Sequence, residues 1–184
     1  MARDADATKE RILEAATAEF ASHGFAGGRV DRIATRARSN VRMIYAYYGG
    51  KAELFDAALG QALRRMAENV PPRAENLSEW AGEVFDHHQS YPEVLRLSMW
   101  AQLERPETLA EPLEIYRDKA LAVATAEASP LSPVDVLVLI YAIAQAWELS
   151  PEGLTGLEGD PRSYERLAAH RASIVTAVER MLRQ

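Results

Sequence analysis

Apolar residues recur at helical spacing along most of the chain, and no segment shows the strict alternation that is typical of a strand. In the first part of the chain this pattern predicts helices over residues 8–23, 30–37, 41–48 and 51–70. Further along, it predicts helices over residues 77–90, 92–103, 109–127, 133–149 and 162–183. The sequence therefore predicts an all-α fold with about nine helices.

Glycine and proline residues mark the joints between these helices. A pair of prolines stops the fourth helix, and a loop rich in glycine and proline covers residues 150–161. After the two prolines the composition becomes acidic and strongly apolar. We expect a small N-terminal domain, a shared bridging helix and a larger C-terminal domain, over residues 1–51, 52–70 and 71–184.

The charge is distributed unevenly around a formal net value of −6. Residues 1–51 hold nine basic and six acidic residues, a net +3, whereas residues 52–184 hold twelve and twenty-one, a net −9. Between residues 29 and 51 there are six basic residues and one acidic residue, a net +5. Such a local excess is expected where a small module meets phosphate groups. A solvated basic face is the alternative.

The second and third predicted helices are short and are joined by a tight turn, which is the arrangement of a helix-turn-helix. Asn40 is a good N-cap for the third helix, whose first turn exposes Val41, Arg42 and Met43. In this motif the second helix lies in the major groove, where Arg42 could pair with a guanine. Val41 or Met43 could contact a thymine methyl group. A basic three-helix packing unit is the alternative.

Residues 8–59 resemble the DNA-binding region of the tetracycline-repressor (TetR) family of transcriptional regulators. The resemblance lies in a first helix that ends with an aromatic before "HGF", then "VDRIATRA", a turn, and "MIYAYYGGKAEL". It implies a homodimer that binds a palindromic double-stranded DNA operator and responds to a small molecule in its C-terminal region. It also implies that Tyr45 and Tyr47 contact the DNA backbone and that Lys51 contacts a phosphate.

The sequence departs from the family pattern at four positions. Arg29 stands where serine or threonine is usual, so it could reach a phosphate but cannot supply a hydroxyl cap. Arg38 and Ser39 replace a glycine and a valine, which leaves the turn conformation open and removes an apolar anchor. Tyr48 replaces phenylalanine and is expected to be a core aromatic with its hydroxyl at the rim.

The run "VLVLIYAIAQAW" carries no charge over about three helical turns, so this helix must be covered on every face. The last predicted helix offers a second apolar stripe, and two such helices per chain could form a four-helix dimer interface. A central helix buried within a monomer is the alternative. The interface candidates are Leu137, Ile140, Leu167, Ile174, Val175, Val178 and Leu182.

Aromatic and polar side chains are crowded into the otherwise apolar C-terminal helices, as expected around a pocket for a hydrophobic or aromatic effector. His88 and Gln145 are the stronger candidates, because polar groups in a buried stripe need hydrogen-bond partners. Core packing explains the aromatic residues equally well. The full set of candidates is Trp80, Phe85, His88, Tyr91, Met99, Trp100, Tyr116, Tyr141, Gln145 and Trp147.

Catalytic and metal-binding patterns are absent from the sequence. Without cysteine there is no disulfide, thiolate metal site or cysteine nucleophile. The adjacent His87 and His88 would point about 100° apart on a helix, which does not suit one metal ion. No nucleophile-elbow or phosphate-loop pattern occurs, so we expect no catalytic residues, no metal and no cofactor. The charged start and the lack of a long apolar run predict a cytoplasmic protein without a membrane partner.

These observations favour a cytoplasmic, dimeric, ligand-responsive regulator, and a repressor in particular. Two alternatives from other classes remain open at this point. One is a helical enzyme or carrier that acts on a hydrophobic small molecule and keeps a three-helix cap. The other is an architectural DNA-binding protein that has no effector pocket.

Overall fold

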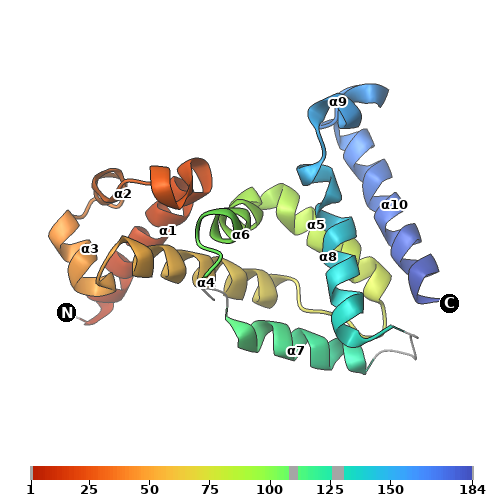
Figure 1. Cartoon of the computed structure of the whole chain (residues 1–184), viewed down its shortest axis with the longest axis horizontal. Coiled ribbons are helices and arrows are strands. Elements are labelled where there is room, and N and C mark those ends of the chain that lie inside the picture. Colours follow the sequence, from red (N-terminus) through yellow and green to blue (C-terminus); the bar gives the residue numbers. More distant parts are fainter. Residues whose placement is uncertain (1, 108–111, 126–130, 184) are drawn as a thin grey trace. The chain divides into compact units, whose positions relative to one another are not determined.

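The computed structural model describes residues 2–107, 112–125 and 131–183 (Figure 1). The described residues form ten α-helices and one short 3₁₀-helix, and they contain no strand, which confirms the all-α prediction. The elements are α1 Ala2–Gly27, α2 Val30–Arg36, α3 Val41–Tyr48, α4 Lys51–Asn69, α5 Leu77–Ser90, α6 Pro92–Glu104, α7 Leu113–Ala124, α8 Pro133–Leu149, α9 Glu152–Thr155, η1 Gly156–Glu158 and α10 Tyr164–Leu182.

The described residues form ten α-helices where about nine were predicted. The extra helix, α9, has four residues and lies in the segment predicted as a loop. One helical turn is too short to show a periodic apolar pattern. The ends of the helix predicted over residues 109–127 lie outside the described residues, and α7 is the described part. No single described helix is long and apolar enough to cross a membrane. The helices Pro133–Leu149 and Glu152–Glu158 are long and apolar enough only when taken together, and they are bent by 88° relative to each other.

Local sequence signals account for the helix boundaries. The side chains of Asn40, Ser132 and Ser163 each accept a hydrogen bond from a backbone N–H in the first turn of the helix that follows. Proline occupies the first turn of α6 and α8, where no backbone N–H is needed. Inside α1, Gly24 has a φ of 72°, so the regular helix breaks where the sequence predicted its end.

The chain divides into two compact units. The first consists of residues 1–67 and 91–113, and the second of residues 68–90 and 114–184. In the first unit α6 packs along α1, so this helix groups with the N-terminal elements. The functional division expected at residues 51 and 70 stays a prediction.

Residues 24–26, at the end of α1, contact the start of α4 and the end of α6. Phe25 lies 5.0 Å from the Lys51 ammonium at the start of α4 and 4.9 Å from the Arg105 guanidinium that follows α6. The Ala26 N–H donates to the Glu104 carboxylate at 2.9 Å, and the Ala26 carbonyl accepts from Lys51 at 3.1 Å. The Arg105 guanidinium also forms an ion pair with Asp56 on α4. The same short segment therefore fixes the start of α4 and the end of α6.

In the second unit α5 packs against both α8 and α10. Trp80 is fully buried, and its indole N–H donates to the Val70 carbonyl at 3.0 Å. The seam between α5 and α10 is closed by the Arg171 guanidinium, which contacts Glu79 at 2.6 Å and Asp86 at 2.7 Å. A Cβ atom at Gly82 would lie only 2.9 Å from the Arg171 Cζ, so this glycine makes room for the guanidinium.

The ion pair between Arg105 and Asp56 should stabilise the first unit measurably, because Arg105 is largely buried and Asp56 is partly buried. We expect Arg105→Ala to lower the free energy of unfolding by about 2 kcal/mol, since it leaves the Asp56 carboxylate without its charged partner. Arg183→Ala is the matched control: Arg183 pairs with Glu179 at the surface, and its loss should cost less than about 0.5 kcal/mol. Urea unfolding followed by circular dichroism measures both values, and equal losses would contradict this account.

Candidate nucleic-acid interface and effector site

The turn between α2 and α3 takes a defined conformation despite its unusual residues. Arg38 occupies the left-handed region with a φ of 50°. The Ala37 N–H donates to the Ile33 carbonyl at 2.9 Å, and the Ser39 N–H donates to the Ala34 carbonyl at 2.9 Å. The turn therefore closes with arginine in a backbone conformation that favours glycine.

Both departures from the family pattern have a physical cost. A left-handed conformation costs a residue with a Cβ atom roughly 1 kcal/mol or more. The Ser39 hydroxyl is buried and has no hydrogen-bond partner among the described residues. A buried hydroxyl without a partner is unfavourable because it gives up its hydrogen bonds to water. An apolar side chain at this position would have no such hydrogen bonds to give up. At Arg29, as expected, no side-chain cap forms on α2.

Helix α3 is anchored on one face and open on the other. Ile44 is fully buried, and the Tyr48 hydroxyl donates to the Lys9 carbonyl at 3.1 Å, which makes Tyr48 a core aromatic at the rim. Arg42, Met43 and Tyr45 are exposed. The sequence candidates Val41 and Tyr47 are half-buried, and Asn40 caps the helix through the Met43 N–H at 2.8 Å.

Some of the basic side chains in this region already have acidic partners. Arg29 contacts Asp31 at 2.8 Å, and Arg32 contacts the largely buried Glu19 at 2.5 Å. Burial raises the pKa of Glu19, but hydrogen bonds from the Arg32 side chain and the Arg29 N–H outweigh it and lower the pKa overall. Glu19 is therefore ionised and neutralises Arg32.

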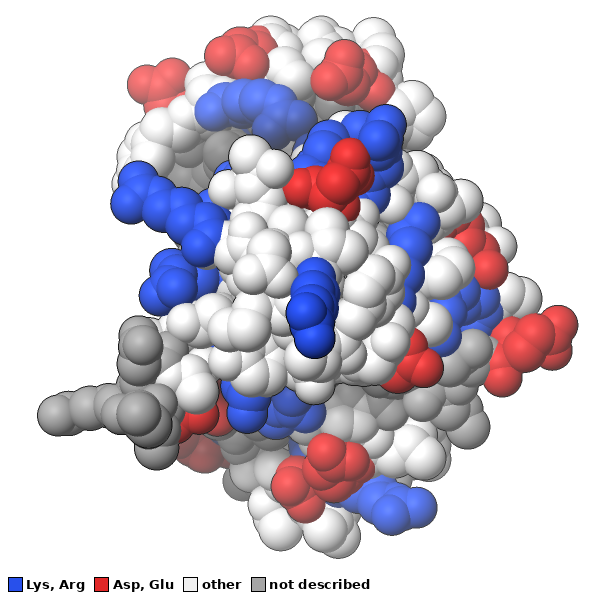
Figure 2. Space-filling model, turned by 90° about the vertical axis from the view of Figure 1, so that its left-hand side faces the viewer, with Lys and Arg blue, Asp and Glu red and all other residues white. Residues whose placement is uncertain are grey.

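Three guanidinium groups remain without a partner. Arg36 at the end of α2, Arg38 in the turn and Arg42 in the first turn of α3 are all exposed. No hydrogen bond or ion pair from the described part of the chain engages their side chains. We call these three residues the α2–α3 basic surface. Figure 2, which views the molecule from the side of α2 and α3, shows Lys and Arg side chains distributed over this face. Such a surface can bind phosphate oxygens.

A buried polar cluster lies in the second unit, between residues of α5, α7 and α8. The sequence candidates His88 and Gln145 lie together, with 3.4 Å between their Nε2 atoms. The Lys119 ammonium donates to the Tyr141 hydroxyl at 2.5 Å, and the Tyr141 ring packs edge-on against Trp80, with 6.0 Å between the ring centroids. Four predicted pocket candidates thus take part in contacts here, Tyr141 with both Lys119 and Trp80, and His88 with Gln145.

Lys119 was missed by the sequence analysis, although a signal was available. It lies four residues after Ile115 and four before Val123, and both of these are buried. A lysine at this position falls on the apolar stripe of its helix. Only 5 % of Lys119 is exposed. Within the described residues, no group of three or more metal-ligating side chains is found here or elsewhere.

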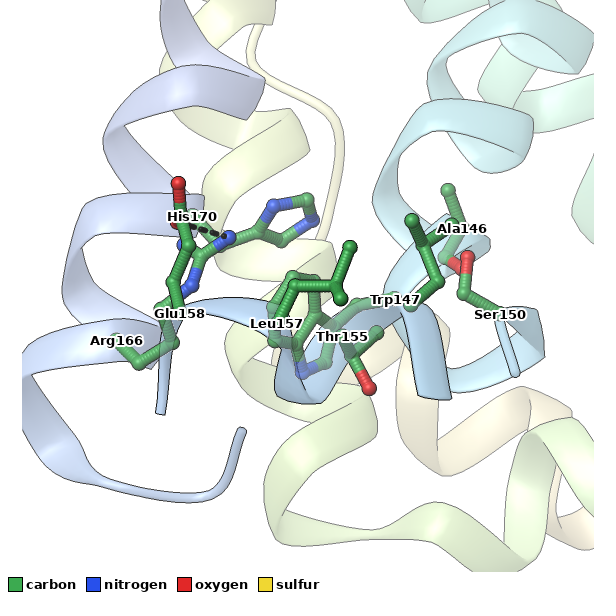
Figure 3. Close-up of a pocket in the computed structure, with 9 residues that line it drawn as sticks. Ala146, Trp147, Ser150, Thr155, Leu157, Glu158, Arg166 and His170 are labelled. Carbon is green, nitrogen blue, oxygen red and sulfur yellow. Dashed lines mark hydrogen bonds and ion pairs between the residues drawn. The ribbon is translucent and has the colours of Figure 1, made fainter. Parts of the chain in front are cut away.

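Trp147 lies elsewhere in the second unit, at a cavity of about 330 Å³ formed by residues of α8, α9, η1 and α10 (Figure 3). The His170 ring lies 4.4 Å from the Trp147 ring, and the Arg166 guanidinium lies 4.6 Å from it. Arg166 also contacts Glu158 at 3.3 Å. This cavity is a second concave site in the same unit.

The remaining pocket candidates are dispersed. Tyr91, Met99 and Trp100 belong to the first unit, where Tyr91 and Met99 are exposed and the Trp100 N–H donates to the Ala21 carbonyl at 3.3 Å. Phe85 packs against His170, with 5.4 Å between the ring centroids, and Tyr116 is half-buried on α7. Their role in effector binding stays a prediction.

The predicted dimer-interface residues fall into two groups. Leu137, Ile140, Ile174 and Val178 are buried within the chain's own second unit, and Leu167, Val175 and Leu182 are half-buried. Helix α8 also carries exposed apolar residues, and Val134 and Val138 are each 60 % exposed. Alanines on α10 are exposed as well, at positions 168, 169, 172 and 177.

Two short helices joined by a tight turn, the second one capped, are the arrangement of helix-turn-helix DNA-binding proteins. Three arginines without a partner among the described residues lie at this turn. Residues 12–58 match the model of bacterial regulatory proteins of the tetR family. Residues 76–180 match the model of the tetracyclin repressor-like C-terminal domain. The chain belongs to the tetR family.

Individual relatives agree with this assignment. The HTH-type transcriptional repressor SCO4008 of Streptomyces coelicolor is 41% identical over 154 residues, 78% of this chain and 79% of that protein. The HTH-type transcriptional repressor NicS of Pseudomonas putida is 35% identical over 103 residues, 52% of this chain and 49% of that one. The solved structure of SCO4942 from S. coelicolor, assigned to transcriptional regulators, is 36% identical with a TM-score of 0.81, covering 95% of this chain and 97% of that one.

Family membership decides between the classes that the sequence left open. This chain is a ligand-responsive DNA-binding regulator of transcription, and its family consists of non-enzymatic proteins. Repressors of the family bind DNA operators and dimerise. The alternative of a helical enzyme or carrier is therefore not supported.

The conformation of Arg38 gives opposite expectations for two neighbouring arginines. We expect Arg38→Gly to raise the free energy of unfolding by about 1 kcal/mol, because glycine adopts the left-handed conformation without steric cost. Arg36→Gly, on the helical residue two positions earlier, should lower it by up to about 1 kcal/mol. Thermal unfolding of both variants checks the sign, and a loss of stability in Arg38→Gly would contradict the turn geometry.

Proposed function

We propose that this chain is a homodimeric transcriptional repressor of the cytoplasm that binds a palindromic operator through the α2–α3 basic surface of each protomer. The observation that carries the proposal is the presence of three exposed guanidinium groups, on Arg36, Arg38 and Arg42, around a helix whose start is capped and whose opposite face is buried. A helix held in this way can enter the major groove while neighbouring cations bind the backbone.

The exposed start of α3 would read bases. Arg42 is suited to a bidentate contact with the O6 and N7 atoms of a guanine, and Val41 and Met43 to contact with a thymine methyl group. Asn40 would act indirectly, since its side chain caps the helix.

Contacts with the DNA backbone, which position the protein on the duplex, would come from Arg36 and Arg38, together with Arg29, Tyr45, Tyr47 and Lys51. Arg29 would have to exchange Asp31 for a phosphate, and Lys51 would use the N–H groups that the Ala26 carbonyl leaves free. We therefore assign the main share of backbone binding to the two unpaired arginines.

We propose that α8 and α10 form the dimer interface. The buried candidates, such as Ile140 and Ile174, would shape these helices from within, and the exposed Val134 and Val138 would meet the partner. Small alanine side chains on α10 would let the helices approach closely. Two helices from each protomer would then form a four-helix interface.

The effector would bind in the second unit, at the polar cluster around His88, Lys119, Tyr141 and Gln145. Binding would change the preferred separation of the two α3 helices by way of α4. Such a mechanism is a population shift, so it requires that the effector binds one arrangement more tightly than the other.

Operator binding should depend differently on the three arginines. Arg36→Ala and Arg38→Ala should weaken binding to all DNA sequences and reduce the slope of log K against log salt by about 1 per bound protomer, because each removes a phosphate contact. Arg42→Ala should reduce affinity for the preferred site about tenfold to hundredfold and relax the choice of one base pair.

Fluorescence anisotropy with DNA from around the protein's own gene, at several salt concentrations, measures both effects. Arg162→Ala, which removes an exposed arginine of the second unit, serves as the control and should bind like wild type. Unchanged binding by all three surface variants would refute the proposed interface.

The dimer interface can be tested with one charge. Val138→Arg should shift the protein to a monomer and reduce operator affinity by at least about tenfold, because an unpaired buried charge is costly in an interface. Leu121→Arg, on the exposed side of α7, should leave the dimer intact. Sedimentation velocity distinguishes the two, and a dimeric Val138→Arg variant would exclude this face.

A further inference from the structure

We infer that the effector of this regulator is an anion: the Lys119 ammonium recognises an acidic group, such as a carboxylate, on an aromatic small molecule. The inference rests on the proposed function, because it assigns a chemical class to the effector site of that proposal. It is carried by the burial of the Lys119 ammonium and by its contact with the Tyr141 hydroxyl.

Lys119 is a buried cation without a counter-charge. No carboxylate of the described residues lies within ion-pair distance of its ammonium, although the second unit is rich in acidic residues. Its hydrogen-bond partner is the neutral Tyr141 hydroxyl. Removing an ammonium group from water costs free energy that is normally offset by a paired anion. A bound acidic group would supply that anion.

The groups around Lys119 are neutral or donate hydrogen bonds. The facing groups from α5 are His87 and His88, and burial lowers the pKa of both, to about 4 for His88. From α8, Tyr141 faces the ammonium, and burial raises the pKa of its hydroxyl. The Lys119 ammonium and the Tyr141 hydroxyl, which lie in contact, can both donate to one oxyanion. These groups offer no negative charge that would attract a cation.

The lysine keeps its proton at neutral pH. Burial lowers the pKa of Lys119 to about 8, so the ammonium form still predominates at pH 7. A bound anion would favour this charged form further. The Tyr141 ring and the Trp80 ring that packs on it would contact the aromatic part of the ligand.

The cavity beside Trp147 is a weaker candidate for an anion. Its cation, Arg166, already contacts the Glu158 carboxylate at 3.3 Å, so its charge is compensated. The Arg166 Nε and His170 Nε2 atoms do lack partners among the described residues. Arg166→Met therefore belongs in the test as a competitor.

Two fluorescent probes with the same ring system separate charge from apolar contact. One is 8-anilinonaphthalene-1-sulfonate, an anion, and the other is N-phenyl-1-naphthylamine, which lacks the sulfonate. We expect Lys119→Met to weaken binding of the anion at least about tenfold, since a charge-assisted contact in a buried site is lost. Binding of the neutral probe should stay the same or improve.

The matched control is Arg117→Met, which removes an exposed positive charge from the same helix and should bind both probes like wild type. In addition, Lys119→Met without probe should have a higher melting temperature than wild type, because an apolar side chain of similar length replaces a buried charge. A residue with a merely structural role would lower the melting temperature when it is replaced.

The pH dependence gives an independent readout. Wild-type affinity for the anion should be constant between pH 6 and 7 and should fall as the pH rises through about 8, where Lys119 loses its proton. In Lys119→Met this fall should be absent. His88 stays neutral over this range because its pKa lies at about 4, and burial lowers the pKa of His87 as well.

Three results would overturn the inference. Wild type does not bind the anionic probe, Lys119→Met binds it as tightly as wild type, or only Arg166→Met binds it more weakly than wild type. Operator binding by Lys119→Met, measured in parallel, separates this inference from the proposed function. If operator binding is retained while anion binding is unchanged, the anion inference fails and the regulator stands. If wild type does not bind operator DNA, the proposed function fails whatever the probes show.

Discussion

The structure of the first unit depends on how the end of α1 is held. Phe25 lies close to two cations, and the backbone of Ala26 binds a carboxylate with its N–H and an ammonium with its carbonyl. These contacts tie the start of α4, which directly follows α3, to the residues that end α6. Arg105, which lies on the aromatic ring and is largely buried, is a stronger restraint than a surface ion pair. The orientation of α3 within this unit therefore depends on residues of α6 that lie about 55 positions away in the sequence.

Periodicity was sufficient to predict most of the helices, because each long helix buries one continuous apolar stripe. The starts of α3 and α8 follow from capping side chains and, in α8, from a proline in the first turn, which a single sequence displays. The sequence could not show which acidic residue pairs with each basic side chain. Whether Arg29, Arg36 or Arg42 is free for DNA depends on which acidic residues fold next to each of them, and Asp31 and Glu19 neutralise only Arg29 and Arg32. The grouping of α6 with α1 likewise results from tertiary packing.

Three features of this protein lower its stability, and all lie at surfaces or clusters that we connect with function. Arg38 adopts a conformation better suited to glycine, the Ser39 hydroxyl is buried without a partner in the described part of the chain, and Lys119 places a charge in the interior. Each could be relieved by a single substitution. Local conflict between sequence and structure is expected mainly where another requirement competes with folding. For Arg38 that requirement would be a positive charge in the turn, and for Lys119 an anion-binding group.

The contact between Gly82 and Arg171 links two positions of the α5–α10 seam during evolution. A methyl group at position 82 would collide with the guanidinium, and loss of the guanidinium would leave Glu79 and Asp86 next to each other without a cation. A side chain at position 82 would therefore require the guanidinium to move away from the two carboxylates. Among regulators that share this C-terminal domain, a larger residue at position 82 should therefore occur together with a shorter, uncharged residue at position 171 and with the loss of one of the two acids.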